Sequence, residues 1–274
     1  MQSATGSISG QSGSFVACKI ISSGASDIGR RRPQNQDTLF LDDQIGLYIV
    51  ADGMGGHNAG KTASSLAVET ISAFIRRTRE QERLTWPYGI DPQISYNGNG
   101  LRTAMMLANR RIWREAESQD RYTGMGTTVV AALADGGMMS IAHAGDSRAY
   151  RIHQSAIEQL TTDDTWVQAV VETGIVQHDQ ARNHRLKNII TKAVGAEQNI
   201  EVPVIEQCLE PGDHLLLCSD GLHGMVQDSR ILEIVRSAGG DLGKAVSALI
   251  EAANSGGGKD NITVILVSCG LISD

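Results

Sequence analysis

The sequence lacks any apolar run close to the roughly 18 residues that a membrane-spanning helix needs. Its N-terminus also lacks a basic segment followed by an apolar one, the mark of a secretory signal. We therefore expect a cytoplasmic protein with no membrane partner. The four cysteines form no Cys-x-x-Cys pair, so we interpret them as reduced thiols and not as zinc ligands.

Basic side chains are not in excess, because 24 Lys and Arg stand against 31 Asp and Glu, for a formal net charge of −7. This balance disfavours a polyanion as the main partner, so we expect no nucleic acid. No internal repeat is evident in the 274 residues. A hydrophobic content of 41% is enough for a sizeable core, and we expect one domain and a monomer.

The hydrophobic pattern places this domain at residues 15–270, after a Ser-, Gly- and Gln-rich tail over residues 1–14 that is expected to be flexible. Short apolar or β-branched runs predict strands, and apolar residues at helical spacing predict helices. The expected strands cover residues 15–21, 38–41, 47–51, 127–133, 138–144, 148–152, 157–160, 214–218 and 262–268. The expected helices cover residues 63–75, 101–112, 229–237 and 242–254, with an irregular connection over 80–100. Closely spaced strands imply antiparallel pairing, and this grouping of elements indicates α+β layers.

Five aspartates lie beside glycine or small polar residues where expected strands end and turns begin. They are Asp37, Asp52, Asp146, Asp220 and Asp260. Any single Asp-Gly pair is ordinary turn chemistry, because Asp tolerates turn geometry and Gly supplies positive φ. Five converging carboxylates, however, would repel one another unless cations neutralised them.

Oxygen ligands without a His or Cys set of zinc spacing favour Mg²⁺ or Mn²⁺ over Zn²⁺. Gly53, which follows one of the aspartates, leaves room for a backbone carbonyl to complete a metal's shell. From the residues alone we expect a hydrolase that uses two or more metal ions, with no substrate identified.

Taken in order, these motifs resemble those of the metal-dependent protein phosphatases of the type 2C serine/threonine class, particularly the compact bacterial members. Each motif is weak alone, whereas the ordered set is highly specific and covers nearly the whole chain after the tail. The motifs are Ser26-Asp27-Ile28-Gly29, Arg32-Pro33-Gln34-Asn35-Gln36-Asp37, Asp52-Gly53-Met54-Gly55-Gly56-His57, Gly126-Thr127-Thr128, Gly145-Asp146-Ser147-Arg148, Ser219-Asp220-Gly221-Leu222 and Asp260-Asn261-Ile262-Thr263. The resemblance implies two central antiparallel β-sheets in a sandwich, flanked by α-helices in α-β-β-α layers.

The resemblance also implies two core ions, Mn²⁺ or Mg²⁺. Asp52 would bridge them, and the backbone carbonyl of Gly53 would join one of them. Asp220 and Asp260 would hold the other ion, while Asp37 would act directly or through a coordinated water.

Three further positions carry implied roles. Asp146, with Asp220, matches positions that hold a third and looser ion in bacterial relatives. Gln36 stands where the family commonly has Glu, and this amide is expected in the outer shell, where it weakens the ordering of metal waters only modestly. Arg32 would clamp the phosphate, because a planar guanidinium donates two hydrogen bonds to phosphoryl oxygens. The alternative is that it belongs to a solvated basic run with the two arginines before it.

The implied reaction is in-line attack on phosphorus by a metal-bridging hydroxide, without a phosphoenzyme. Asp37, Asp52 and Arg32 would be its catalytic residues. His57 is a candidate for protonating the leaving group, although a metal-bound water could serve instead and His57 could be structural.

Residues 161–185 resemble the mobile flap beside the active site of bacterial members, and a flap poised near the metals would gate access. Relatives often carry His-Ser after an Asp here, whereas this chain has Asp163-Asp164-Thr165. An ordinary surface helix and loop is the alternative reading of this segment.

The implied function is removal of phosphate from phosphoserine and phosphothreonine in proteins, which opposes serine/threonine kinases in signalling. The partners would be phosphorylated kinase substrates. One alternative is a binding or regulatory module without activity, against which the retained aspartates argue. Another is a phosphohydrolase of small molecules, which the same chemistry permits and which activity on free nucleotides or sugar phosphates would reveal.

Overall fold

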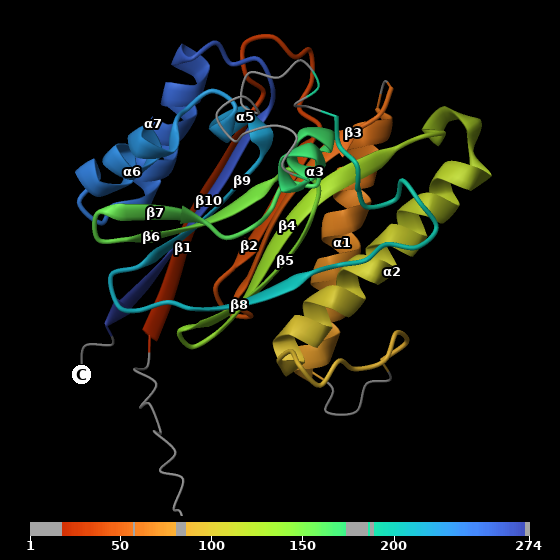
Figure 1. The fold of residues 1–274 in the computed structure, drawn as a ribbon, viewed down its shortest axis with the longest axis horizontal. Coiled ribbons are helices and arrows are strands. Elements are labelled where there is room, and N and C mark those ends of the chain that lie inside the picture. Colours follow the sequence, from red (N-terminus) through yellow and green to blue (C-terminus); the bar gives the residue numbers. More distant parts are fainter. Residues whose placement is uncertain (1–17, 57, 81–85, 174–185, 187–188, 272–274) are drawn as a thin grey trace, which may run out of the picture.

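Two five-stranded antiparallel sheets form the centre of the computed structural model, which describes residues 18–56, 58–80, 86–173, 186 and 189–271 (Figure 1). The first sheet has the order β1 (Cys18–Asp27), β10 (Ile262–Leu271), β9 (His214–Cys218), β6 (Arg148–His153) and β7 (Ala156–Gln159). The second has the order β2 (Asp37–Asp42), β3 (Leu47–Met54), β4 (Gly126–Asp135), β5 (Met138–Ala144) and β8 (Val204–Cys208). The expected tail over residues 1–14, His57 and the flap residues 174–185 lie outside the described residues.

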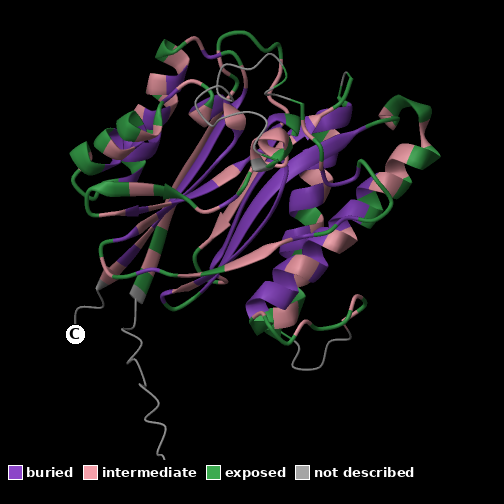
Figure 2. Ribbon diagram, in the orientation of Figure 1, coloured by how far each residue is buried: buried purple, intermediate pink, exposed green. Residues whose placement is uncertain are grey.

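Helices cover the outer face of each sheet, which confirms the predicted α-β-β-α sandwich (Figures 1 and 2). The second sheet is covered by α1 (Ala59–Glu80) and α2 (Tyr96–Ser118). The first is covered by α5 (Asp220–His223), α6 (Asp228–Ser237) and α7 (Leu242–Ser255). The short elements η1 (Asp120–Tyr122) and α3 (Trp166–Glu172) lie in the connections.

The apolar runs of the central strands follow from burial on both faces. In β3, Leu47 and Ile49 pack in the core beneath α1 and α2, whereas Tyr48 and Val50 pack in the core between the two sheets. Alternate side chains of a strand point to opposite faces, so a strand inside a sandwich is apolar at nearly every position. Each such side chain contributes about 1.5–3 kcal/mol by burial, which gives the loops at the strand ends a rigid base.

Several boundaries differ from the sequence prediction. Helix α2 begins at Tyr96, inside the predicted irregular connection, because the Ser95 hydroxyl caps it by accepting a hydrogen bond from Gly98 N at 2.9 Å. Strand β8 and helices α3 and α5 were not predicted. Cys208 and Cys218 are free thiols, as predicted, but Cys269 is disulfide-bonded, so the prediction was wrong there. In the part of the chain that the structure describes, no helix combines the length and apolarity needed to cross a membrane.

Candidate metal and phosphate site

The five aspartates come from strand ends in both sheets. Asp37 and Asp52 are register partners on β2 and β3. Asp220 opens α5 just after β9, Asp260 lies just before β10, and Asp146 lies between β5 and β6. Because β9 and β10 are neighbours in one sheet and β2 and β3 in the other, the site draws on both sheets.

Asp37 is the least exposed of these five residues, at 2%. Its Oδ2 accepts hydrogen bonds from Ser219 Oγ at 2.9 Å and from Thr263 Oγ1 at 2.6 Å. Burial nevertheless raises the pKa of Asp37 to about 6. The two hydroxyl donors come from the other sheet, so Asp37 is held across the seam of the sandwich.

Mutual repulsion adds to burial at the other aspartates. Burial, and then the charges of the other four aspartates, raise the pKa of Asp52 well above its ordinary value. Burial and the charge of Asp146 raise the pKa of Asp220 to about 8. Asp52 and Asp220 keep part of their surface in contact with solvent, so a cation can reach both. A bound cation would favour the ionised forms.

Two carboxylate oxygens have no donor to satisfy them. Oδ1 of Asp37 and Oδ1 of Asp220 are buried and have no hydrogen-bond partner among the described residues. Such oxygens fit hard divalent cations. Among the same residues, no three His, Cys, Asp or Glu side chains by themselves form a group that could hold a metal ion. Water completes much of the octahedral shell of Mg²⁺ in proteins, so few carboxylates are needed, and the two orphaned carboxylate oxygens fit such an ion.

Gly53 is required by the close approach of α1 to β3. A Cβ added at Gly53 would lie 2.0 Å from the carbonyl oxygen of Gly60, which no side chain could tolerate. Gln36 packs against the same turn of α1. Its Oε1 would lie 2.9 Å from a Cβ added at Gly60, and its backbone carbonyl accepts a hydrogen bond from Ser64 Oγ at 2.6 Å. Gln36 therefore lies beside the backbone of Gly53, where an outer-shell residue is expected.

Arg32 lies at the edge of the cluster, with its side chain 51% exposed. Its Nη2 donates to Asp260 Oδ2 at 2.6 Å. The charges of Asp52 and Asp220 also raise the pKa of Arg32, after the hydrogen bond to Asp260. A guanidinium has five N–H donors, so this one bond leaves donors for a phosphoryl group.

Buried polar side chains position the loops, although the sequence interpretation gave them no role. Asn261 is 3% exposed, and its Nδ2 donates to the carbonyls of Ile28 and Gln34 at 3.0 and 3.1 Å, while its Oδ1 accepts from Gln36 N at 2.8 Å. Thr127 Oγ1 donates to the carbonyl of Asp52 at 2.8 Å. Asn261 and Thr127 both belong to the sequence motifs that resemble the phosphatase family, so these motifs could have identified them.

The described part of residues 161–173 is tied to the same end of the molecule. Arg148 donates two hydrogen bonds to Asp163, at 2.8 and 2.7 Å, and Asp164 Oδ2 accepts from Gly145 N at 3.0 Å. Lys192 Nζ lies 3.0 Å from Asp164 Oδ1. The charges of the Asp163-Asp164 pair are thus matched by basic partners.

His223 borders the site, at a position to which the sequence analysis gave no role. It lies on α5, and its Nε2 lies 3.0 Å from the carbonyl oxygen of Asp146. Burial lowers the pKa of His143 and His214, which is typical of histidines packed in the fold.

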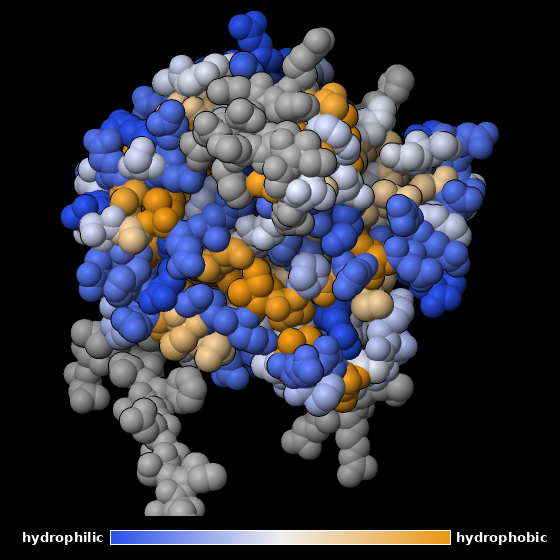
Figure 3. Space-filling model, viewed as in Figure 1, coloured by the Kyte–Doolittle hydropathy of each residue, from blue (hydrophilic) through white to orange (hydrophobic). Residues whose placement is uncertain are grey.

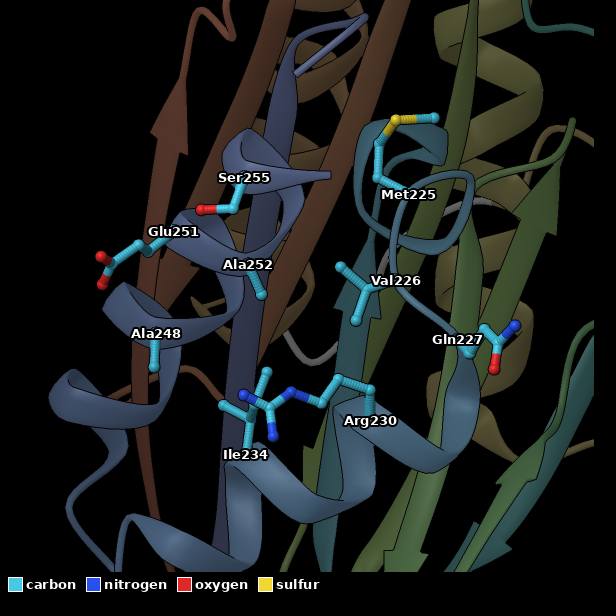
Figure 4. A pocket seen from close by; sticks show the side chains of 9 residues that line it. All are labelled: Met225, Val226, Gln227, Arg230, Ile234, Ala248, Glu251, Ala252 and Ser255. Atoms are coloured by element: carbon cyan, nitrogen blue, oxygen red, sulfur yellow. The ribbon is translucent and has the colours of Figure 1, made fainter. Parts of the chain in front are cut away.

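A separate groove of about 660 Å³ lies between α6 and α7 (Figure 4). Ile234 and Ala248 contribute apolar walls, and Arg230 and Glu251 contribute charged ones. None of the five aspartates lines it, so the groove is distinct from the candidate site.

Comparison with known proteins adds an independent line of evidence. The profile described as Protein phosphatase 2C matches residues 23–240. The serine/threonine phosphatase stp of Listeria monocytogenes is 39% identical over 248 residues, which cover 88% of this chain and 92% of the relative. The crystal structure of the Mycobacterium tuberculosis serine/threonine phosphatase PstP/Ppp is 31% identical, with a TM-score of 0.80 over 92% of this chain and 99% of that one. A PstP catalytic domain in complex with two manganese ions is also 31% identical, with a TM-score of 0.77 over 92% of this chain and 98% of that one.

Proposed function

Because the chain belongs to the protein phosphatase 2C family, we propose that its aspartate cluster is the site at which it hydrolyses phosphoserine and phosphothreonine in proteins. The chain is a metal-dependent serine/threonine protein phosphatase, with a role in signalling that opposes serine/threonine kinases. One observation carries the choice of site. Asp37 and Asp220, held at the ends of opposite sheets, each keep a buried carboxylate oxygen with no hydrogen-bond partner among the described residues.

The ions would be held by oxygen ligands alone. The proposed ligands of two core ions, Mn²⁺ or Mg²⁺, are Asp37, Asp52, Asp220, Asp260 and the carbonyl of Gly53, with Asp146 and Asp220 for a third ion and Gln36 in the outer shell. Bound ions supply Lewis-acid polarisation of phosphoryl oxygens and lower the pKa of a coordinated water. The orphaned oxygens and the raised carboxyl pKa values support this assignment.

The chain's own side chains orient the reacting groups. Arg32 donates its remaining N–H groups to the phosphoryl oxygens and offsets their growing charge. Ser219 and Thr263 fix Asp37 through Oδ2, which leaves Oδ1 for an ion. His57 is proposed to protonate the leaving serine or threonine oxygen, because it follows Asp52 by only five positions. A His57→Asn variant should therefore flatten the alkaline limb of the pH–rate profile.

The direct test is phosphate release from a phosphothreonine peptide by metal-stripped protein, with and without Mn²⁺. We expect Mn²⁺-dependent release, which Asp52→Asn and Asp220→Asn each abolish. The matched control is Asp135→Asn, because Asp135 is exposed at the end of β4 and has no role in the site. The assignment would be refuted if Asp135→Asn also lost activity, or if both site variants released phosphate as fast as wild type.

The same assay separates the two alternative functions. Mn²⁺ binding without release from any phosphopeptide would favour a regulatory module. Faster release from nucleotides or sugar phosphates than from phosphopeptides would favour a small-molecule phosphohydrolase. Magnesium in place of manganese, over a range of concentrations, would show which ion supports turnover and whether a third, weaker site contributes.

The remaining assignments concern the cellular setting. We propose that residues 15–270 act as a single catalytic domain, with a tail over 1–14 and a flap over 161–185. We also propose a cytoplasmic monomer whose partners are phosphorylated proteins, without nucleic acid or membrane partners. The net charge of −7 supports the part of this proposal that concerns nucleic acid.

A further inference from the structure

The loop between β1 and β2 holds three consecutive arginines on an ordered backbone. Its first turn is fixed by Gly29 N, which donates to Asp27 Oδ1 at 2.8 Å. Arg30 N donates to the carbonyl of Gly258 at 2.7 Å, in the loop that precedes β10. Gly29 has φ +79°, and a Cβ there would lie 2.2 Å from the carbonyl oxygen of Asp260, so the two loops are in close contact. The arginines are therefore carried by a fixed support (Figure 1).

Three basic side chains on these loops form a surface that we call the basic rim: Arg30, Arg31 and Lys259. All three are exposed. Arg32 and Asp260 form an ion pair between these two loops. Within the described part of the chain, none of the three basic-rim side chains forms an ion pair. In Figure 3, strongly hydrophilic side chains project at the tip where the β1–β2 loop lies in Figure 1.

The rim is unusual in its charge. The chain as a whole carries a net charge of −7, and five of its carboxylates gather beside the rim. Exposed cations next to that cluster would help to lower the local negative potential that a phosphorylated substrate meets. Lys259 adjoins Asp260, and Arg30 and Arg31 adjoin Arg32, so the rim borders the proposed phosphate clamp on two sides.

We propose that the basic rim recognises acidic side chains or a second phosphoryl group next to the phosphorylated residue of a protein substrate. The proposal rests on the function proposed above and names its preferred substrates as phosphoproteins with acidic flanks. An extended peptide advances about 3.3 Å per residue, so residues one or two positions from the phosphorylated one come within reach of the rim. Carboxylates and phosphates are the groups that exposed guanidinium and ammonium groups bind best.

The test compares two phosphothreonine peptides, one with neutral flanks and one with Asp or Glu on both sides, with Mn²⁺ present. The measured quantity is the ratio of their kcat/KM values, in wild type and in the triple variant Arg30→Gln, Arg31→Gln, Lys259→Gln. The matched control is the triple variant of Arg77, Arg110 and Arg114 to Gln, which removes the same charge from exposed positions on α1 and α2. A doubly phosphorylated peptide extends the series.

We expect wild type and the control variant to prefer the acidic peptide by on the order of 10-fold at low ionic strength, because three exposed charge pairs each contribute a small factor. The rim variant should bring the ratio close to one, and salt should shrink it in wild type. An equal ratio in wild type and rim variant, with hydrolysis intact, would overturn the substrate preference alone. If wild type hydrolysed none of the phosphopeptides, the proposed function itself would be overturned.

Discussion

Ionised Asp37 is expected to destabilise the metal-free protein, and replacing it by Asn should remove this effect. The side chain is 2% exposed, and burial raises its pKa from 3.8 to about 6. A carboxyl whose pKa is raised in the folded state holds its proton more tightly there than in the unfolded chain. Its contribution to stability is therefore complete below pH 3.8 and is lost as the pH rises through about 6.

The size of the effect follows from that shift. A rise in the pKa of Asp37 from 3.8 to about 6 corresponds to about 3 kcal/mol of unfolding free energy. Roughly half of it, about 1.5 kcal/mol, is lost between pH 5 and pH 8. For a chain of this length that difference corresponds to about 3–6 °C in Tm. Because Asn does not titrate, the unfolding free energy of Asp37→Asn relative to wild type should rise by this amount from pH 5 to pH 8.

The assay is thermal denaturation of metal-stripped wild type, Asp37→Asn and the exposed control Asp135→Asn at pH 5 and pH 8. Taking the difference between wild type and variant cancels the titration of histidines and other groups that do not interact with Asp37. The Asp37 charge also raises the pKa of Asp52 and of Asp220, so its removal adds to the expected gain at pH 8. Saturating Mn²⁺ at pH 8 should then raise the Tm of wild type more than that of Asp37→Asn, because a ligand stabilises the state that binds it. A Tm difference that does not change with pH, or that favours wild type at pH 8, would refute the reasoning.

Three further predictions concern backbone fit, loop anchoring and phosphate binding. Gly53→Ala should lower the unfolding free energy, measured by urea denaturation, by about 1–3 kcal/mol, because the new Cβ would lie 2.0 Å from Gly60 O. The control Gly56→Ala should change it little, because a Cβ there has no atom within 4 Å. Asn261→Ala should cost about 2–4 kcal/mol in the same assay, since it leaves two carbonyls and one N–H of the β1–β2 loop without their partner. Arg32→Lys keeps the charge but loses the planar fork, so kcat/KM on a phosphopeptide should fall by on the order of 10-fold with little change in Tm. A Lys variant as active as wild type would leave Arg32 outside phosphate binding.

The sequence was most informative where burial is complete. Residues 47–51 and 214–218 were predicted as strands because strands buried on both faces are apolar throughout. Strand β8 was missed because it is a sheet edge whose residues are only partly buried, so no clean alternation marks it. Helix α5 has only four residues, too few to show a helical period.

The candidate site divides in the same way. The five aspartates stand out as local turn motifs, so their identity was accessible without coordinates. The hydrogen bond from Arg32 to Asp260 joins residues 228 positions apart, and the bond from Thr263 to Asp37 joins residues 226 apart. Contacts of that range depend on how two sheets pack, which residue order alone does not specify.

The sandwich places opposing forces at its middle and at one end. In the middle, Tyr48 and Val50 of one sheet and Ile265 and Val267 of the other share a core of fully buried side chains, which holds the sheets together. At the end, aspartates from both sheets lie close together, and burial, followed by mutual repulsion, raises the pKa values of Asp52 and Asp220. Cations at that end would replace repulsion by attraction across the same seam. The shared apolar core thus holds the two sheets together against the repulsion between the aspartates at their ends. The strand ends can therefore carry these carboxylates even before a cation binds.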